Sequence, residues 1–161
     1  MEANTTGDDN VAVGYAALDA NTTGSDNTAF GDNALGAVTT NSQNTAVGSS
    51  ALLVNTAANQ TAVGSSSMTA NTTGTANVAV GYQSLYTNST GASNTAIGYR
   101  ALKLNATTNQ NTAVGTDALA TNVATENTAV GYTALTANTT GTDNVAVGAY
   151  ALDANTTGND N

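Results

Sequence analysis

The sequence predicts an all-β fold, a parallel β-solenoid (β-roll) wound from nine coils of 16–17 residues. Three observations support this prediction. A motif of the form Ala-Val-Gly recurs every 16 or 17 residues, the residues of each motif alternate as they do in a strand, and a turn-forming segment such as Asn-Thr-Thr-Gly leads to the next copy. Each unit therefore corresponds to one coil of the solenoid.

The repeat covers the whole chain. The glycine of the motif recurs at spacings of 17, 17, 16, 17, 17, 17, 16 and 17 residues. The coils start near residues 4, 21, 38, 55, 71, 88, 105, 122, 138 and 155. Residues 1–161 are therefore expected to form a single repeat domain. No capping sequence is visible at either end, so we expect a fragment of a longer fibre, with stacking of copies head to tail as the alternative.

The strand of each coil is expected in the motif itself, which reads Thr-Ala-Val or Val-Ala-Val in most units. The third residue is always large and apolar, so we expect it to point inward as a core residue. The second residue is always Ala, which indicates that the opposite face also packs closely, against another chain. The expected inward residues are Val13, Phe30, Val47, Val63, Val80, Ile97, Val114, Val130 and Val147.

The glycine after the strand predicts a tight corner, where a positive φ or a missing Cβ is needed. Four residues after it stands a second expected core residue, Leu or Met in every coil. The return turn follows, since Asn and Gly tolerate left-handed conformations. The second set of core residues is Leu18, Leu35, Leu52, Met68, Leu85, Leu102, Leu119, Leu135 and Leu152.

A longer period is superimposed on the coils. The two 16-residue units begin at Asn55 and Asn122, which lie 67 residues apart, and the Val form of the strand recurs at Val11, Val78 and Val145. Complete and degenerate turns alternate in pairs. Duplication of a four-coil block and a four-coil structural period both explain this pattern.

Composition excludes several classes of function. Only 8% of the residues are charged, and the chain has no His, no Cys and a net charge of −9. We therefore expect no catalytic, cofactor-binding or metal site, and no enzyme activity. With two basic residues, binding to nucleic acid is not expected. Membrane insertion is not expected either, because no apolar run is long enough.

Self-association is the expected source of stability. Two large apolar side chains per coil form a thin core for a chain without disulfides. A homotrimer with the Ala face at the seam between subunits, or head-to-tail stacking, would bury more surface.

The strand and corner, for example Asn10-Val-Ala-Val-Gly14, resemble the head repeats of trimeric autotransporter adhesins (YadA-like heads, Hep/Hag repeats), with the consensus Asn-Ser-Val-Ala-Ile-Gly-x-x-Ser. Similar repeats occur in phage tail fibres. The closing Ser is kept only at Ser67 and Ser84. The resemblance covers about five residues in each unit, and the family's coil is shorter than this one. It implies a trimeric, extracellular rod that binds a host or matrix.

Other side chains give candidate surface features. Tyr15, Tyr82, Tyr99 and Tyr132 follow the corner glycine and form a candidate partner-contact stripe, with filling of a subunit seam as the alternative. Acidic residues cluster in the return turn and are expected to be solvated rather than to bind calcium. The only two basic residues are expected to form no more than an ordinary surface ion pair, for instance between Arg100 and Asp117. The turn acids are Asp8, Asp9, Asp26, Asp143 and Asp160.

These observations favour a structural fibre or adhesin rod at the cell surface or on a virion. It would attach outside the cell by multivalent binding to an unknown cell-surface, matrix or glycan receptor. A self-stacking extracellular filament subunit is the alternative, and an ice-binding β-solenoid is the third candidate. Ice binding needs regularly spaced Thr on a flat strand face. The adjacent pairs such as Thr5-Thr6 cannot both face one side of a strand.

Overall fold

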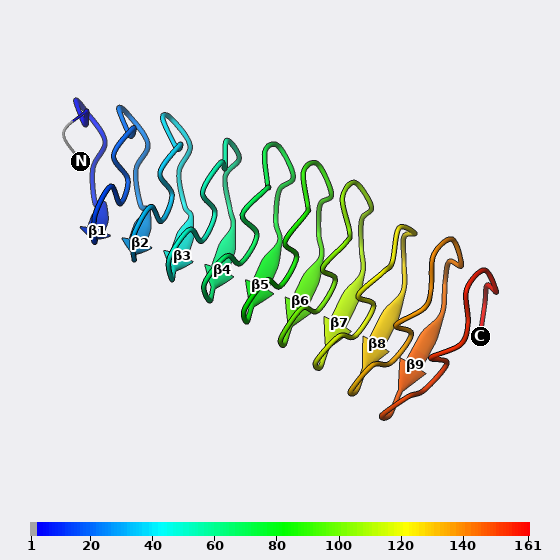
Figure 1. Ribbon diagram of the computed structural model, residues 1–161. Coiled ribbons are helices and arrows are strands. Elements are labelled where there is room, and N and C mark those ends of the chain that lie inside the picture. Colours follow the sequence, from blue (N-terminus) through cyan, green and yellow to red (C-terminus); the bar gives the residue numbers. More distant parts are fainter. Residues whose placement is uncertain (1–2) are drawn as a thin grey trace.

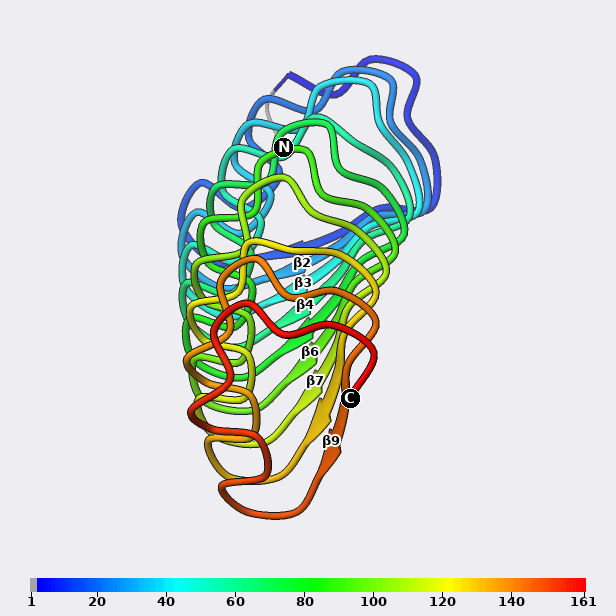
Figure 2. The same cartoon turned by 90° about the vertical axis from the view of Figure 1, so that its right-hand side faces the viewer.

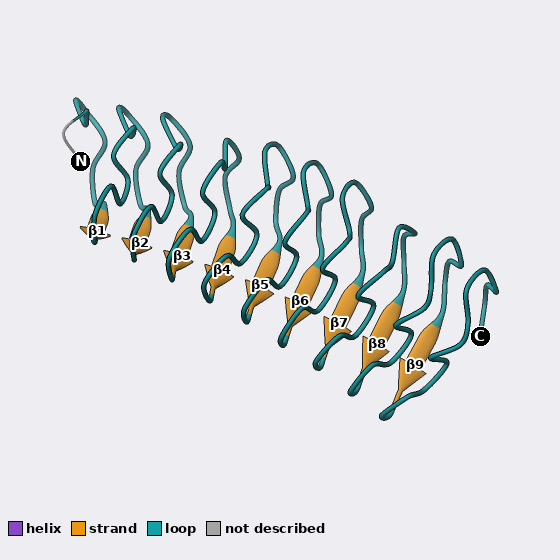
Figure 3. Ribbon diagram, viewed as in Figure 1, coloured by secondary structure: helices purple, strands orange, loops and turns teal. Residues whose placement is uncertain are grey.

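The computed structural model describes residues 3–161 and shows a parallel β-solenoid (Figure 1). Nine strands of three residues form a single sheet, in which the order of the strands is their order in the chain. The rest of the described chain is turns and loops, with no helix (Figure 3). The predicted fold class is confirmed. The strands are β1 (Val11–Val13), β2 (Thr28–Phe30), β3 (Thr45–Val47), β4 (Thr61–Val63), β5 (Val78–Val80), β6 (Thr95–Ile97), β7 (Thr112–Val114), β8 (Thr128–Val130) and β9 (Val145–Val147).

Equivalent residues of successive coils lie side by side. Every strand pairs in parallel with the next, and Ala12, for example, lies opposite Ala29. The register shift is one residue smaller into β4 and β8, which belong to the two 16-residue units. Viewed roughly along the rod in Figure 2, the coils overlap as elongated loops with the strands along one wall. Each side chain therefore belongs to a column that runs along the rod.

The expected orientation of the strands is wrong. The second-position Ala points into the coil and is fully buried in β2 through β8, whereas the third-position residues face outward. Phe30 is 56% exposed and Ile97 is 39% exposed. The residues that were predicted to lie in the core but face outward are Val13, Phe30, Val47, Val63, Val80, Ile97, Val114, Val130 and Val147. The Ala column is consequently not available as a seam between subunits.

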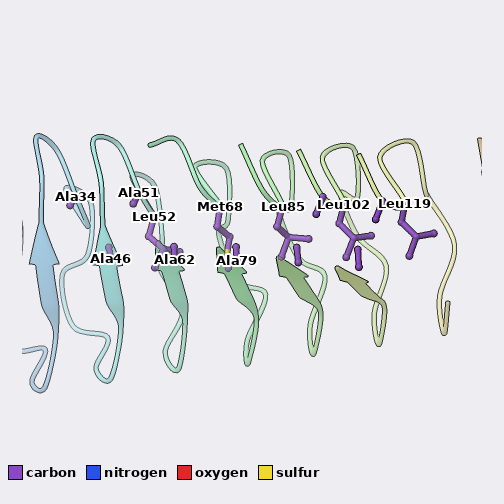
Figure 4. Packing of buried hydrophobic residues seen from close by; sticks show 14 of the residues in the cluster. Ala34, Ala46, Ala51, Leu52, Ala62, Met68, Ala79, Leu85, Leu102 and Leu119 are labelled. Carbon is purple, nitrogen blue, oxygen red and sulfur yellow. The ribbon is translucent and has the colours of Figure 1, made fainter. Parts of the chain in front are cut away.

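The physical reason lies on the opposite wall of the coil. The Leu and Met column, from Leu18 to Leu135, is fully buried as predicted and packs with the Ala column in one hydrophobic cluster. Figure 4 shows Leu52, Met68, Leu85 and Leu102 reaching from that wall toward the strands. One wall supplies the long side chains, so the facing wall has room only for methyl groups. Leu152, in the last coil, is the exception at 37% exposed.

Asparagine forms the remainder of the interior. The first Asn of the return turn donates from Nδ2 to Oδ1 of the same residue in the preceding coil, as from Asn88 to Asn71 at 2.8 Å. It also donates to a carbonyl within its own turn, as to Gly91 O at 3.0 Å. This ladder is interrupted where Val38 replaces Asn. The buried Oδ1 of Asn21 consequently has no hydrogen-bond donor.

A second Asn column, just before each strand, is continuous. Oδ1 of Asn77 accepts the backbone N–H of Asn94 at 2.9 Å, and Nδ2 of Asn77 donates to Gly91 O at 2.8 Å. The same bond from backbone N–H to side-chain oxygen joins all ten units, with Gln60 in place of one Asn. These buried amides satisfy backbone groups of the next coil that no strand reaches.

The corner glycine is required by both conformation and space. Gly81 has a φ of 130°, and a Cβ there would lie 2.4 Å from the carbonyl oxygen of Gly98 in the next coil. Any side chain at this position would push the coils apart. The predicted role of the corner glycine is confirmed.

Candidate functional site

The outer face of the sheet is one continuous surface without charge. The first and third residues of each strand point outward, so a column of Thr or Val runs beside a column of Val, Ile or Phe. Among residues 3–161, no acidic or basic residue lies in a strand. The first-position column is Val11, Thr28, Thr45, Thr61, Val78, Thr95, Thr112, Thr128 and Val145. We call this surface, made of the first and third residues of β1 to β9, the strand face.

The strand face carries a column of large apolar side chains at its third position. In the isolated chain these side chains are half-buried or exposed, and Val13 is 47% exposed. This surface was not expected from the sequence, because both outer positions and the inner Ala are compatible with burial. The size of the opposing Leu was the signal that could have identified it, since Leu leaves no space for a facing Val.

The tyrosines lie at the corner that follows the strand face. Tyr82 and Tyr99, in consecutive coils, have ring centroids 5.6 Å apart and ring planes 16° from parallel. Tyr132 makes an edge-on contact with Tyr150 at 5.3 Å. Tyr15 stands apart and is 82% exposed. The four tyrosines of the predicted stripe are therefore one stacked pair, one ring that pairs with Tyr150 outside the stripe, and one isolated ring. The role of the stripe as a contact surface stays a prediction.

One basic side chain joins the first pair. The guanidinium carbon of Arg100 lies 5.6 Å from the ring centroid of Tyr99, and Arg100 Nε lies 3.2 Å from Asp117 Oδ1 in the next coil. The expected surface ion pair is confirmed. We call Tyr82, Tyr99, Arg100 and Asp117 the aromatic corner.

The side chains of the return turn offer mainly hydroxyl groups, and some of these already donate hydrogen bonds to the next coil. The first Thr of the turn donates from Oγ1 to the backbone of the next coil, as from Thr22 to Thr39 O at 3.0 Å and from Thr72 to Ser89 O at 2.9 Å. These hydroxyls stabilise the stack. Within residues 3–161 no group of three His, Cys, Asp or Glu side chains could hold a metal ion.

Comparison with protein-family models, curated proteins and solved structures finds no match for this chain. The resemblance to adhesin heads therefore depends on the short motif alone and stays a prediction. In residues 3–161 the structure has no helix of the length and apolar character needed to cross a membrane.

Proposed function

We propose that this chain is a structural rod that associates with further copies of itself through the strand face and acts as part of an extracellular fibre or adhesin. The observation that carries the proposal is a neutral apolar face, about 40 Å long at the usual strand spacing, on a protein of net charge −9. Like charges would oppose association of identical chains on most other surfaces.

Identical copies fit this surface because its columns repeat at the same spacing in every chain. Val and Thr side chains pack well against the pleated surface of another sheet, and burying the third-position column would add the second apolar layer that the thin interior lacks. Three parallel copies, as in the adhesin heads that the motif resembles, would place the return turns and aromatic corners outward. Weak contacts repeated along such a rod would give attachment by avidity.

The test is the molar mass in solution over a concentration series. We expect a concentration-independent trimer, three times the 15.8 kDa of one chain. The double variant Val80→Glu with Val114→Glu introduces charges on the strand face and is expected to dissociate the trimer. Its circular dichroism should be unchanged, since both side chains already point outward.

The matched control is Thr75→Glu with Thr107→Glu, which adds the same charges in the return turns of the same two units. This control should remain trimeric. A wild-type chain that stays monomeric would overturn the proposal and would favour the ice-binding candidate. Mass that grows without limit would favour head-to-tail filaments.

A further inference from the structure

The aromatic corner is unlike any other corner on the rod. The position after the corner glycine is Ser, Thr, Asp or Ala in the coils without Tyr, so aromatic residues are not needed to form the turn. Tyr82 and Tyr99 are nevertheless adjacent, and each is 46% exposed. Large aromatic rings held half in solvent on a rigid scaffold are typical of contact surfaces.

The polar groups around the rings form a neutral set. Arg100 and Asp117 balance each other's charge at 3.2 Å, and Arg100 also lies against the Tyr99 ring. The guanidinium and carboxylate together offer several hydrogen-bond donors and acceptors in fixed directions. The only other basic residue, Lys103, lies in the same coil. An anionic ligand would therefore meet little positive charge on a protein of net charge −9.

This combination suits a neutral sugar. A pyranose with equatorial hydroxyls has an apolar C–H face that stacks on an aromatic ring, and its hydroxyls both donate and accept hydrogen bonds at the rim. Nucleic acid does not suit this corner, because its affinity depends on cationic side chains that neutralise phosphates, and the corner offers few of them. One face of each ring is covered by the other ring, and Arg100 lies against Tyr99, so the face left for a sugar is that of Tyr82 turned away from Tyr99. The neighbouring donor and acceptor pair would then meet hydroxyls at the edge of the glycan.

The corner is already in a fixed conformation before any ligand arrives. The backbone N–H of Arg100 donates to Tyr82 O at 3.0 Å, and the backbone N–H of Asp117 donates to Tyr99 O at 2.9 Å. The same ladder continues to Gln83, whose N–H donates to Ser65 O. Binding therefore needs no ordering of the backbone, which reduces its entropic cost.

We propose that the aromatic corner, formed by Tyr82, Tyr99, Arg100 and Asp117, binds neutral glycans built of β-linked hexoses with equatorial hydroxyls. A single corner of this size, without a cavity, binds weakly. The second pair, Tyr132 and Tyr150, repeats the aromatic part without the ion pair. The proposal does not depend on association of the chains, which would only raise the avidity.

The test is titration of the chain with two β-linked glucose oligomers, cellohexaose and laminarihexaose, followed by calorimetry and by tyrosine fluorescence, since the chain has no Trp. We expect saturable binding of at least one of the two, and none of hyaluronan, the acidic control. The variant Tyr82→Ser with Tyr99→Thr introduces the side chains that the neighbouring coils carry at the same position, Ser65 and Thr116. It should fold normally and bind about tenfold more weakly or not at all.

Two further variants separate the corner from the rest of the surface. Arg100→Gln, which copies Gln83 at the equivalent position, should also weaken binding. Tyr86→Thr, which copies Thr69 and lies outside the corner, should bind like the wild type. The proposal is overturned by absence of binding to both hexaoses, by equal binding of the Tyr82 and Tyr99 variant, or by a change in molar mass of that variant, which would assign the tyrosines to a subunit seam.

Discussion

The strand with its corner and the return turn are halves of the same coil, but they tolerate very different amounts of sequence change. The Ala and Gly of the strand and corner are the same in all nine coils. The return turn keeps its two buried Asn columns, with Val38 and Gln60 as replacements, and otherwise varies freely. The difference shows that a residue of this rod is invariant where it packs closely and where its segment also has a fixed length.

Glycine illustrates this rule in both halves. A Cβ on a corner glycine from Gly14 to Gly131 would lie within 2.7 Å of backbone atoms of the next coil. A Cβ on Gly24, in the return turn, would likewise lie 2.3 Å from Asn41 O. The return turn nevertheless loses this glycine in four coils, because it is free to change length.

The changes of length and of residue coincide. Asn41 and Thr108 replace the return-turn glycine in coils that are followed by the two short coils. The shorter turns, Asn55–Gln60 and Asn122–Asn127, have one residue less beside them. A shorter turn in the next coil leaves room for a Cβ at the position of the glycine. This would explain why two degenerate turns occur together in every four coils. The corner has no such freedom, because the register of the strands fixes its length.

The largest effect is expected for Gly81→Ala at the corner. The new Cβ would meet Gly98 O at 2.4 Å and would impose a φ of 130° on Ala. We expect a loss of about 3–4 kcal/mol in the free energy of unfolding, from steric overlap together with backbone strain. Urea unfolding followed by circular dichroism measures it.

The matched control is Gly148→Ala, which has a similar φ of 124° but no atom within 4 Å of the new Cβ. This variant isolates the strain and should lose about 1–3 kcal/mol, less than Gly81→Ala. Equal losses in the two variants would show that backbone conformation, rather than contact with the next coil, makes the corner invariant.

An intermediate effect is expected for Asn94→Ala in the continuous Asn column. Its Oδ1 accepts the buried backbone N–H of Asn111, and its Nδ2 donates to Thr108 O. Removing the amide leaves the N–H of Asn111 unsatisfied, whereas Thr108 O keeps the bond from Asn105 Nδ2, so we expect a loss of about 1–3 kcal/mol. Amide hydrogen exchange at Asn111 should accelerate.

Asn109→Ala provides the comparison on the exposed side of a return turn. Asn109 Oδ1 also accepts a backbone N–H of a neighbouring coil, that of Ala92, but in contact with solvent. Water replaces this bond, and the loss should stay below about 1 kcal/mol. A loss as large as that of Asn94→Ala would contradict the assignment of the buried amides as the main polar support of the stack.

The smallest effect is a gain of stability. Ala76, exposed in a return turn, has a φ of 55°, a left-handed conformation that costs a residue with a Cβ about 1 kcal/mol. Ala76→Gly should therefore raise the free energy of unfolding slightly, although Gly elsewhere destabilises. Ala137→Gly, at a residue without positive φ, should lower it. Thermal unfolding of both variants checks the opposite signs.

The repeat, the position of each strand, the parallel register, the corner glycine, and the inward Leu and Met column could all be predicted from the sequence. These features follow from spacing, because identical units 16–17 residues apart pack in the same way in every coil. The ion pair of Arg100 with Asp117 also followed from spacing, since equivalent corner positions of consecutive coils are neighbours.

Only the tertiary structure decided which face of the strand is buried. Strand alternation separates Ala from Val but does not assign either to the interior, and the larger side chain suggested the wrong one. The width left by Leu on the opposite wall decides in favour of Ala. The same Leu residues adopt φ values near 50°, a conformation that they avoid in isolation, because stacking of the coils fixes the backbone there. The Asn residues likewise indicated turns, and their role as buried ladders appears only when the coils lie on one another.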